Sequence, residues 1–208
     1  MTNEFFDSVY LGKADYYGHE VREDFADFLR GLESRQPYCL DLGCGQGRHA
    51  VFAARAGARV HAVDYSDVAI AQLRGLAEEA GLSITAQSGD VLDLAPAPMT
   101  YDAIFMVSLL SHLAADDLAR IVDMAHQSLA PGGRVYVEAF TTADPGYRKA
   151  ADASETSPAL RHYFAPGGLR RLFSRFAISD YREFVEDDRT HGPAHRHGVA
   201  LLIAGRGR

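Results

Sequence analysis

The sequence is poor in cysteine and has neither a long apolar run nor a signal-like N-terminus. Its two cysteines, Cys39 and Cys44, cannot form a framework of several disulfides, so we expect both to be reduced. No apolar run approaches the roughly 20 residues that span a bilayer. Residues 1–7 are acidic and show no signal-peptide pattern. We therefore expect a cytoplasmic protein with no membrane partner.

The chain also lacks a block of basic residues. Its formal net charge is −7, with no Lys/Arg cluster along the sequence. A phosphate-binding footprint is therefore missing, and we expect a small-molecule partner and no nucleic acid. The length of 208 residues, 47% apolar content and 24% charged content are typical of one globular domain. We expect a single domain over residues 1–208, acting as a monomer or homodimer.

Residues 38–49 form the stretch around which the rest is organised. An apolar run at 38–42 predicts a buried strand, and residues 48–56 predict a helix. Between them lie three glycines at alternate positions: Gly43, Gly45 and Gly47. Such a turn lets a ligand approach bare main chain and the N–H groups that open the helix. Nucleotide cofactors bind at corners of this kind, at the carboxyl end of a parallel strand.

The spacing of the glycines departs from the dinucleotide fingerprint G-x-G-x-x-G. Here it is G-x-G-x-G, and Arg48 stands where the third glycine of that fingerprint would be. Asp41, two residues before Gly43, would repel a pyrophosphate. A carboxylate in that place can instead accept from an ammonium group, or hold a charged cofactor through water.

Residues 41–47, D-L-G-C-G-Q-G, resemble motif I of the class I S-adenosylmethionine (SAM) methyltransferases. Residues 129–135, L-A-P-G-G-R-V, resemble the family's signature before its fifth strand. The resemblance implies an α/β, Rossmann-like class I methyltransferase fold. Its seven-stranded, mostly parallel sheet has an antiparallel last strand and helices on both faces. SAM would be the cofactor.

The remaining pattern agrees with this order of elements. Apolar runs predict strands at 59–64, 83–88, 101–108, 134–140, 177–186 and 199–204, and helical periodicity predicts a helix over 19–32. The last two strands are joined by a short connection, 187–198, so they must pair antiparallel. Aromatic residues at 4–18 show no strong period, and we weigh a packed terminal arm equally against a flap over the site.

Several residues are candidates for binding the cofactor. Asp64 ends the second strand 21 residues after Gly43, where an acid can accept hydrogen bonds from a ribose diol. Tyr65 follows it. The resemblance places Asp90 and Val91 at the adenine, with Asp93 as the rival acid. It places Met106 and Val107 beside the methionine part of SAM. With these we group Asp41 and the three glycines.

The acceptor site is predicted from less regular sequence. Residues 141–166 form a long loop without pattern, our candidate for an acceptor lid. It holds His162 and the cations Arg148 and Arg161.

A cluster of histidines lies further on, at His191, His195 and His197. Three imidazoles this close are able to bind zinc, and a polar hairpin loop is the plain alternative. Because no cysteine pair or helical i, i+4 spacing accompanies them, we predict no metal. We favour contact with the acceptor, with His197, His195 or His162 as general base and Arg196 neutralising an anion.

The tail at 164–173 narrows the resemblance to the tellurite-resistance (TehB-like) group. Known members methylate tellurium and selenium oxyanions, and sometimes small organic acceptors. We therefore expect methyl transfer from SAM to a chalcogen oxyanion or a small organic nucleophile. Two alternatives stay open. An NAD-dependent oxidoreductase suits Asp64 but not Arg48 or the antiparallel last strand. A non-enzymatic SAM-binding regulator would bind SAM without an acceptor.

Overall fold

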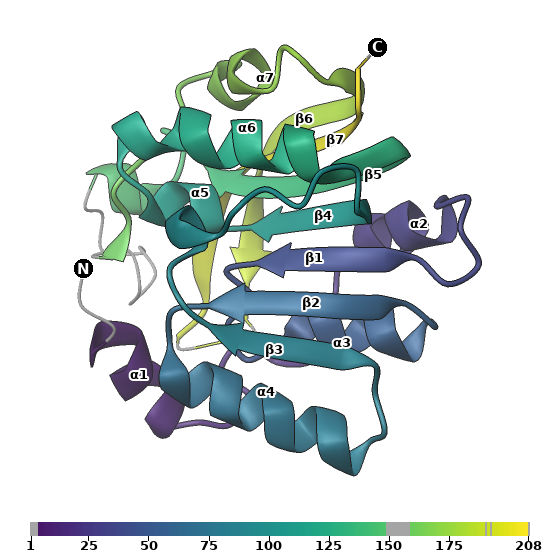
Figure 1. Cartoon of the computed structure of the whole chain (residues 1–208). Helices are drawn as coiled ribbons and strands as arrows, with labels where there is room; N and C mark the ends of the chain where they lie inside the picture. The colour runs from purple at the N-terminus through teal and green to yellow at the C-terminus, as the bar shows by residue number, and fades with distance from the viewer. Residues whose placement is uncertain (1–3, 149–158, 190, 192, 208) are drawn as a thin grey trace.

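The computed structural model describes residues 4–148, 159–189, 191 and 193–207. Its centre is a seven-stranded sheet in the order β3-β2-β1-β4-β5-β7-β6 (Figure 1). The strands are β1 (Tyr38–Leu42), β2 (Arg59–Asp64), β3 (Ile84–Ser88), β4 (Tyr101–Val107), β5 (Leu129–Phe140), β6 (Ala177–Asp188) and β7 (His195–Gly205). Neighbours among β1–β5 pair parallel, whereas β7 is antiparallel to both β5 and β6. The predicted fold class is confirmed.

Helices cover both faces of the sheet. They are α1 (Glu4–Leu11), α2 (Glu23–Arg30), α3 (Arg48–Arg55), α4 (Asp67–Glu79), α5 (Leu109–His112), α6 (Leu118–Ser128) and α7 (Gly168–Leu172). Short 3-10 turns lie at η1 (Val91–Asp93), η2 (Ala115–Asp117) and η3 (Pro145–Arg148). One apolar core lies under α5, α6 and α7, and the other lies under α2, α3 and α4. Figure 1 shows α6 in front of the sheet and α3 behind it.

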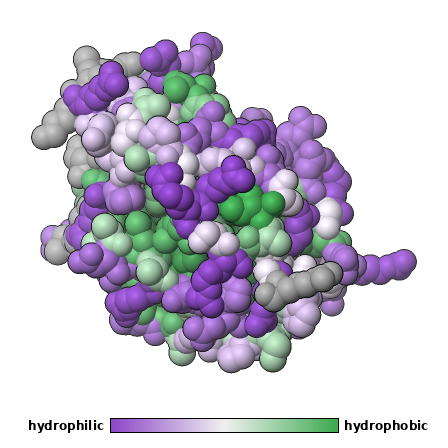
Figure 2. Space-filling view, turned by 90° about the horizontal axis from the view of Figure 1, so that it is seen from above, coloured by the Kyte–Doolittle hydropathy of each residue, from purple (hydrophilic) through white to green (hydrophobic). Residues whose placement is uncertain are grey.

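The surface is mixed in character. Seen from above, hydrophobic side chains show in patches between hydrophilic ones (Figure 2). Within the described part of the chain, no helix has both the length and the apolar character needed to cross a bilayer.

The direction of the strands decides where functional groups gather. Because β1 to β5 are parallel, their carboxyl ends share one edge of the sheet. β6 runs parallel to β5, since both are antiparallel to β7, so its end and the start of β7 reach the same edge. There Asp188 pairs with His195, and Glu186 pairs with His197. The last hairpin therefore lies beside the glycine turn of β1.

Two predicted boundaries near the site were wrong. Half of the segment expected to be a connection, 187–198, is strand, because β6 continues to Asp188 and β7 begins at His195. Burial alternates there: His195 and His197 are buried and Arg196 is exposed. Histidine on the inward face of a strand lacks the apolar signal by which strands are recognised in sequence.

The N-terminal region also differs from the prediction. The helix expected from His19 starts at Glu23, and the aromatic arm contains a helix, α1. Phe6 and Tyr10 lie one turn apart on α1 and are both buried, against Ala69 of α4. Ser66 also donates a hydrogen bond to Asp7. The arm is thus fixed at the edge of the sheet where the parallel strands end (Figure 1).

Replacing Gly47 by alanine is expected to destabilise the fold strongly. Its φ is +88°, and an added Cβ would lie 2.3 Å from Cδ1 of Leu73. For a residue other than glycine, the left-handed backbone lowers the free energy of unfolding by about 1–2 kcal/mol. Overpacking against Leu73 lowers it by about 1–3 kcal/mol more. Gly57 has a φ of +98° with nothing within 4 Å of an added Cβ, so Gly57→Ala reports the backbone cost alone. Urea unfolding should show a larger loss for Gly47→Ala; equal losses would contradict the contact.

Candidate active site

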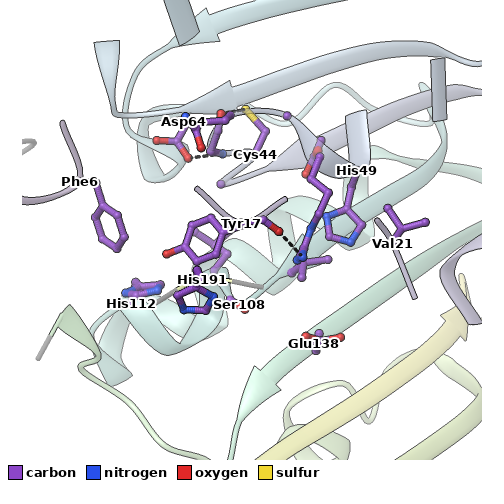
Figure 3. Close-up of a pocket in the computed structure, with 18 of the residues that line it drawn as sticks. Phe6, Tyr17, Val21, Cys44, His49, Asp64, Ser108, His112, Glu138 and His191 are labelled. Carbon is purple, nitrogen blue, oxygen red and sulfur yellow. Dashed lines mark hydrogen bonds between the residues drawn. The ribbon is translucent and has the colours of Figure 1, made fainter. Parts of the chain in front are cut away.

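A cavity of about 510 Å³ opens at the edge of the sheet where the parallel strands end. The glycine turn and α3 form its floor, while the arm supplies Phe6, Tyr10 and Tyr17 from above. Figure 3 shows Phe6 and Asp64 toward one end of it and Glu138 toward the other, with Tyr17 and His191 between them. The volume lies within the range of about 300–1,000 Å³ typical of sites for small ligands. The arm both packs on α4 and lines the cavity, so its position agrees with a packed terminal arm as well as with a flap.

The glycine turn is held in shape by Asp64. The N–H of Gly45 donates to Oδ2 of Asp64 at 2.8 Å, and the N–H of Ser66 donates to Oδ1 at 2.9 Å. Burial raises the pKa of this carboxyl, with the two backbone hydrogen bonds opposing the rise. Each carboxylate oxygen has a further lone pair for a ligand hydroxyl. Asp64 and the three glycines all line the cavity, as the sequence predicts for a cofactor site.

Asp41 provides a buried acceptor. It is 2% exposed, lines the cavity, and its Oδ2 has no hydrogen-bond partner among the described residues. Desolvation, with the charge of Asp64 as the next cause, raises its pKa to about 7. An unpaired buried carboxylate oxygen is costly, and a cationic donor in the cavity would relieve it. This orphaned oxygen fits the ammonium group of a SAM-like cofactor.

The remaining predicted cofactor residues divide between cavity and core. Tyr65, Asp90, Val91 and Val107 line the cavity. The carboxylate of Asp90 accepts from the N–H of Leu92 at 2.9 Å, which holds it at the start of η1. Met106 does not line the cavity: it is fully buried in the core under α5 to α7. Successive residues of β4 point to opposite faces, so Met106 and Val107 cannot both face the ligand.

Ser108 lines the cavity and went unnoticed in the sequence. Its φ is +61°, an uncommon conformation for a residue other than glycine, at the turn from β4 into α5. Its N–H donates to the main-chain oxygen of Glu138 at 2.8 Å. Strained residues cluster at ligand sites, but no sequence pattern marks a serine for this conformation.

The far end of the cavity is rich in ionisable groups. Arg22 forms ion pairs with Glu186 and, at 3.7 Å, with Glu138. Burial raises the pKa of Glu138 to about 7, against the opposing charge of Arg22. At the other end, beside Phe6, burial lowers the pKa of His112 to about 4, so this imidazole is neutral near pH 7 and a weak base. Glu138 is therefore the group suited to take a proton from a ligand. Arg22 carried no sequence signal.

The predicted acceptor residues are only partly brought together. His197 lines the cavity, and its Nε2 lies 3.1 Å from Nε2 of His195, which sits behind it. Arg196 is exposed and does not line the cavity, as expected for the outward position between two inward histidines. His162 also lies outside the lining, with its ring against Phe164.

The predicted lid loop contributes one cation to the cavity. Arg161 lines it, whereas Arg148 is exposed and does not. Residues 149–158 of the loop lie outside the described residues. The N–H groups of Arg161 and His162 donate to the main-chain oxygen of Ser111, at 2.8 and 3.0 Å, which fixes the end of the loop against α5.

The fold and the glycine turn define a class of protein. Residues 39–133 match the family model of the methyltransferase domain, and that segment contains the turn, Asp64, Asp90 and Val91. That segment and the fold are those of a class I SAM-dependent methyltransferase domain, and SAM is the cofactor of that family.

The individual relatives described here match the chain at 39% identity or less. Hemagglutinin 1 of Eikenella corrodens is 31% identical over 157 residues, which cover 74% of this chain and 52% of that protein. The ubiquinone biosynthesis O-methyltransferase of Xylella fastidiosa (strain 9a5c) is 39% identical over 101 residues, covering 47% and 39%. The chain thus spans about half of these relatives or less. The crystal structure of TehB from Haemophilus influenzae shares the fold, with a TM-score of 0.75, 19% identity, and coverage of 97% of this chain and 67% of that chain.

Proposed function

We propose that the chain transfers a methyl group from SAM to a small organic acceptor that carries a hydroxyl group. The single observation that supports it most is the pairing of Asp41 and Asp64 at the glycine turn. Asp41 offers an unpartnered buried oxygen for the amino acid part of SAM, and Asp64 offers lone pairs for its ribose. In this orientation the sulfonium faces the end of the cavity that holds Glu138 and His197.

In this reaction SAM supplies the reactive methyl group, and the protein mainly positions the acceptor against it. A lone pair of the acceptor oxygen forms a bond to the methyl carbon while the carbon–sulfur bond breaks, and sulfur keeps the electron pair. The protein must hold oxygen and carbon in line at roughly 3–3.5 Å. The hydroxyl proton passes to a base, for which Glu138 is suited because burial raises its pKa to about 7. The O-methyltransferase relative supports an oxygen acceptor.

A chalcogen oxyanion is the second candidate acceptor. It would need positive charge rather than a base. Arg161 lines the cavity and favours it, whereas Arg22 is engaged with Glu138 and Glu186. Binding of SAM without any transfer would instead identify a regulator.

The test uses SAM with a labelled methyl group. The protein is titrated with SAM and with NAD by calorimetry, then incubated with phenols, catechols, tellurite and selenite. Label on a hydroxyl compound is the expected result, and label on an oxyanion would select the second candidate. SAM binding without transfer to any acceptor, or binding of NAD instead, would overturn the proposal.

Replacing His197 by alanine is expected to lower turnover at least tenfold while SAM affinity changes less than threefold. His197 lines the cavity from β7, and β1, β4 and β5 separate that strand from β2, which ends in Asp64. Arg196→Ala is the matched control, because its side chain points away from the cavity. Kinetics and calorimetry on both variants give the answer. Unchanged turnover in His197→Ala would remove this residue from the acceptor site.

A further inference from the structure

We propose that Asp188, His191, His195 and His197 form a binding site for one divalent transition-metal ion of the zinc class. Each residue offers one ligand atom, and the four atoms lie within 4.8 Å of one another. The three histidines are buried and Asp188 is partly buried. No metal was expected from the sequence, because no cysteine pair or helical i, i+4 spacing accompanies these histidines. The β6–β7 hairpin brings them together instead.

The distances fit a tetrahedral ion. Nε2 of His195 and Nε2 of His197 are 3.1 Å apart, and each lies 3.9 Å from Oδ2 of Asp188. Nδ1 of His191 lies 3.5 Å from the same oxygen. Zinc–nitrogen bonds of 2.0–2.1 Å in a tetrahedron set neighbouring ligand atoms about 3.3 Å apart. The four atoms therefore need only small movements to coordinate one ion.

The tautomers of two histidines give an independent argument. Nδ1 of His195 is 2.7 Å from the main-chain oxygen of Pro193, and Nδ1 of His197 is 2.9 Å from Oδ2 of Asp144. Both partners are acceptors, so each Nδ1 carries a hydrogen. Each Nε2 of a neutral ring then presents a lone pair, and the two lone pairs face each other beside the carboxylate of Asp188. Convergent lone pairs of this kind require a shared proton or a metal ion.

Asp144 holds the ring of His197 from the side of Nδ1, away from the proposed ion. The side chain of Asp144 is fully buried and accepts from the N–H groups of Gly146 and Gly198, at 2.7 and 3.2 Å. Gly198 allows this approach, because a Cβ there would lie 2.4 Å from the main-chain nitrogen of Asp144. A carboxylate on the far nitrogen of a histidine is the usual partner of a metal ligand, fixing both its tautomer and its orientation.

Aromatic rings hold the imidazoles in place. Tyr17 and Tyr16 lie against His191, with ring centroids 4.8 and 5.2 Å away, and Phe140 lies 4.6 Å from His197. A set of three imidazoles and one carboxylate suits zinc and its neighbours among the transition metals, whereas magnesium and calcium prefer oxygen.

The location of the cluster deepens the proposed function and rests on it. Asp188, His191 and His197 line the cavity, so an ion bound by them would border the acceptor. With all four protein ligands in place the ion would be closed, so the acceptor oxygen would have to join it as a fifth ligand or replace Asp188. That oxygen would then ionise near neutral pH, as metal-bound water does, and its proton would pass to Glu138 or to water before the oxygen attacks the methyl carbon. The acceptor class is therefore a phenol or catechol whose oxygen can bind the metal.

The first measurement is the metal content of the full chain. The protein is stripped with a chelator, loaded with Zn²⁺ or Co²⁺, and desalted. We expect one equivalent of Zn²⁺ by elemental analysis, and a visible Co²⁺ spectrum typical of a nitrogen-rich tetrahedral site. His195→Gln and Asp188→Asn should each weaken binding at least tenfold in competition with a chelating dye. His126→Gln is the control, since that histidine lies on α6 against Phe176.

Each outcome decides the proposal. Less than a tenth of an equivalent of metal in the wild-type chain, or equal affinity in His195→Gln, would overturn the metal site. If a variant fails to fold, the wild-type Co²⁺ spectrum alone decides. A methyl-transfer assay with labelled SAM on the same samples separates the two proposals: metal bound without methyl transfer contradicts the proposed function, and transfer by metal-free protein contradicts the role of the ion at the acceptor.

Discussion

Replacement of Asp64 by alanine is expected to weaken SAM binding by about tenfold to a hundredfold. Two effects combine. The ribose loses a charged acceptor, and hydrogen bonds to charged groups contribute about 1.5–3 kcal/mol. The glycine turn also loses its brace, because the N–H groups of Gly45 and Ser66 both donate to this carboxylate. Titration calorimetry with SAM and with S-adenosylhomocysteine measures the loss.

Asp93→Ala is the matched control for this experiment. Asp93 was the rival acid in the sequence, but in the structure it is exposed at the end of η1 and does not line the cavity. Its removal should leave SAM affinity within twofold of the wild type. Unchanged affinity in Asp64→Ala would contradict the assignment of the ribose site.

Replacement of Asp41 by asparagine is expected to stabilise the empty protein and to weaken SAM binding at least tenfold. The pKa of Asp41 is raised from 3.8 to about 7 in the folded chain, first by desolvation. Between these values the folded state holds a proton that the unfolded state has released, so stability falls as pH rises across this window. Asparagine removes this penalty, which reaches its full size above pH 7 and is on the order of 4 kcal/mol for a shift of about three pKa units.

The pH dependence separates the two effects. The melting temperature of Asp41→Asn should match the wild type near pH 4 and exceed it at pH 8. The SAM affinity of the wild type should rise between pH 6 and 8, as the carboxylate ionises, and that of the variant should stay flat. Asp102→Asn is a control: Asp102 accepts from the N–H of Tyr38 at the other end of β1. A wild-type affinity independent of pH would contradict the role of Asp41.

The cofactor half of the site was predictable from sequence for physical reasons. Glycines at alternate positions have few other uses, and an acid at the end of β2 follows from the strand pattern alone. Gly45 and Asp64 therefore appear where they were expected, and they touch. Met106 shows the limit of such reasoning. An all-apolar central strand does not reveal which of two successive residues faces the ligand.

The acceptor half could not be predicted to the same depth. Asp144 and His197 are 53 residues apart, and their contact depends on the β5–β7 register and on the bare backbone of Gly198. Asp188 joins the histidines through antiparallel pairing across the hairpin. Local pattern shows that polar residues are present in such segments, but it does not show which of them converge.

The groups proposed for SAM and for the acceptor come from separate parts of the chain, and this affects how related enzymes can differ in substrate. Groups proposed to hold SAM come from β1, β2 and the turns after β3 and β4, whereas those proposed to meet the acceptor come from β5 onward and from the arm. In related enzymes the β6–β7 hairpin can therefore change, and with it the molecule that is methylated, while the SAM-binding residues stay the same. Transplanting residues 177–205 between related enzymes would test this, with Glu138 and Arg161 left in place.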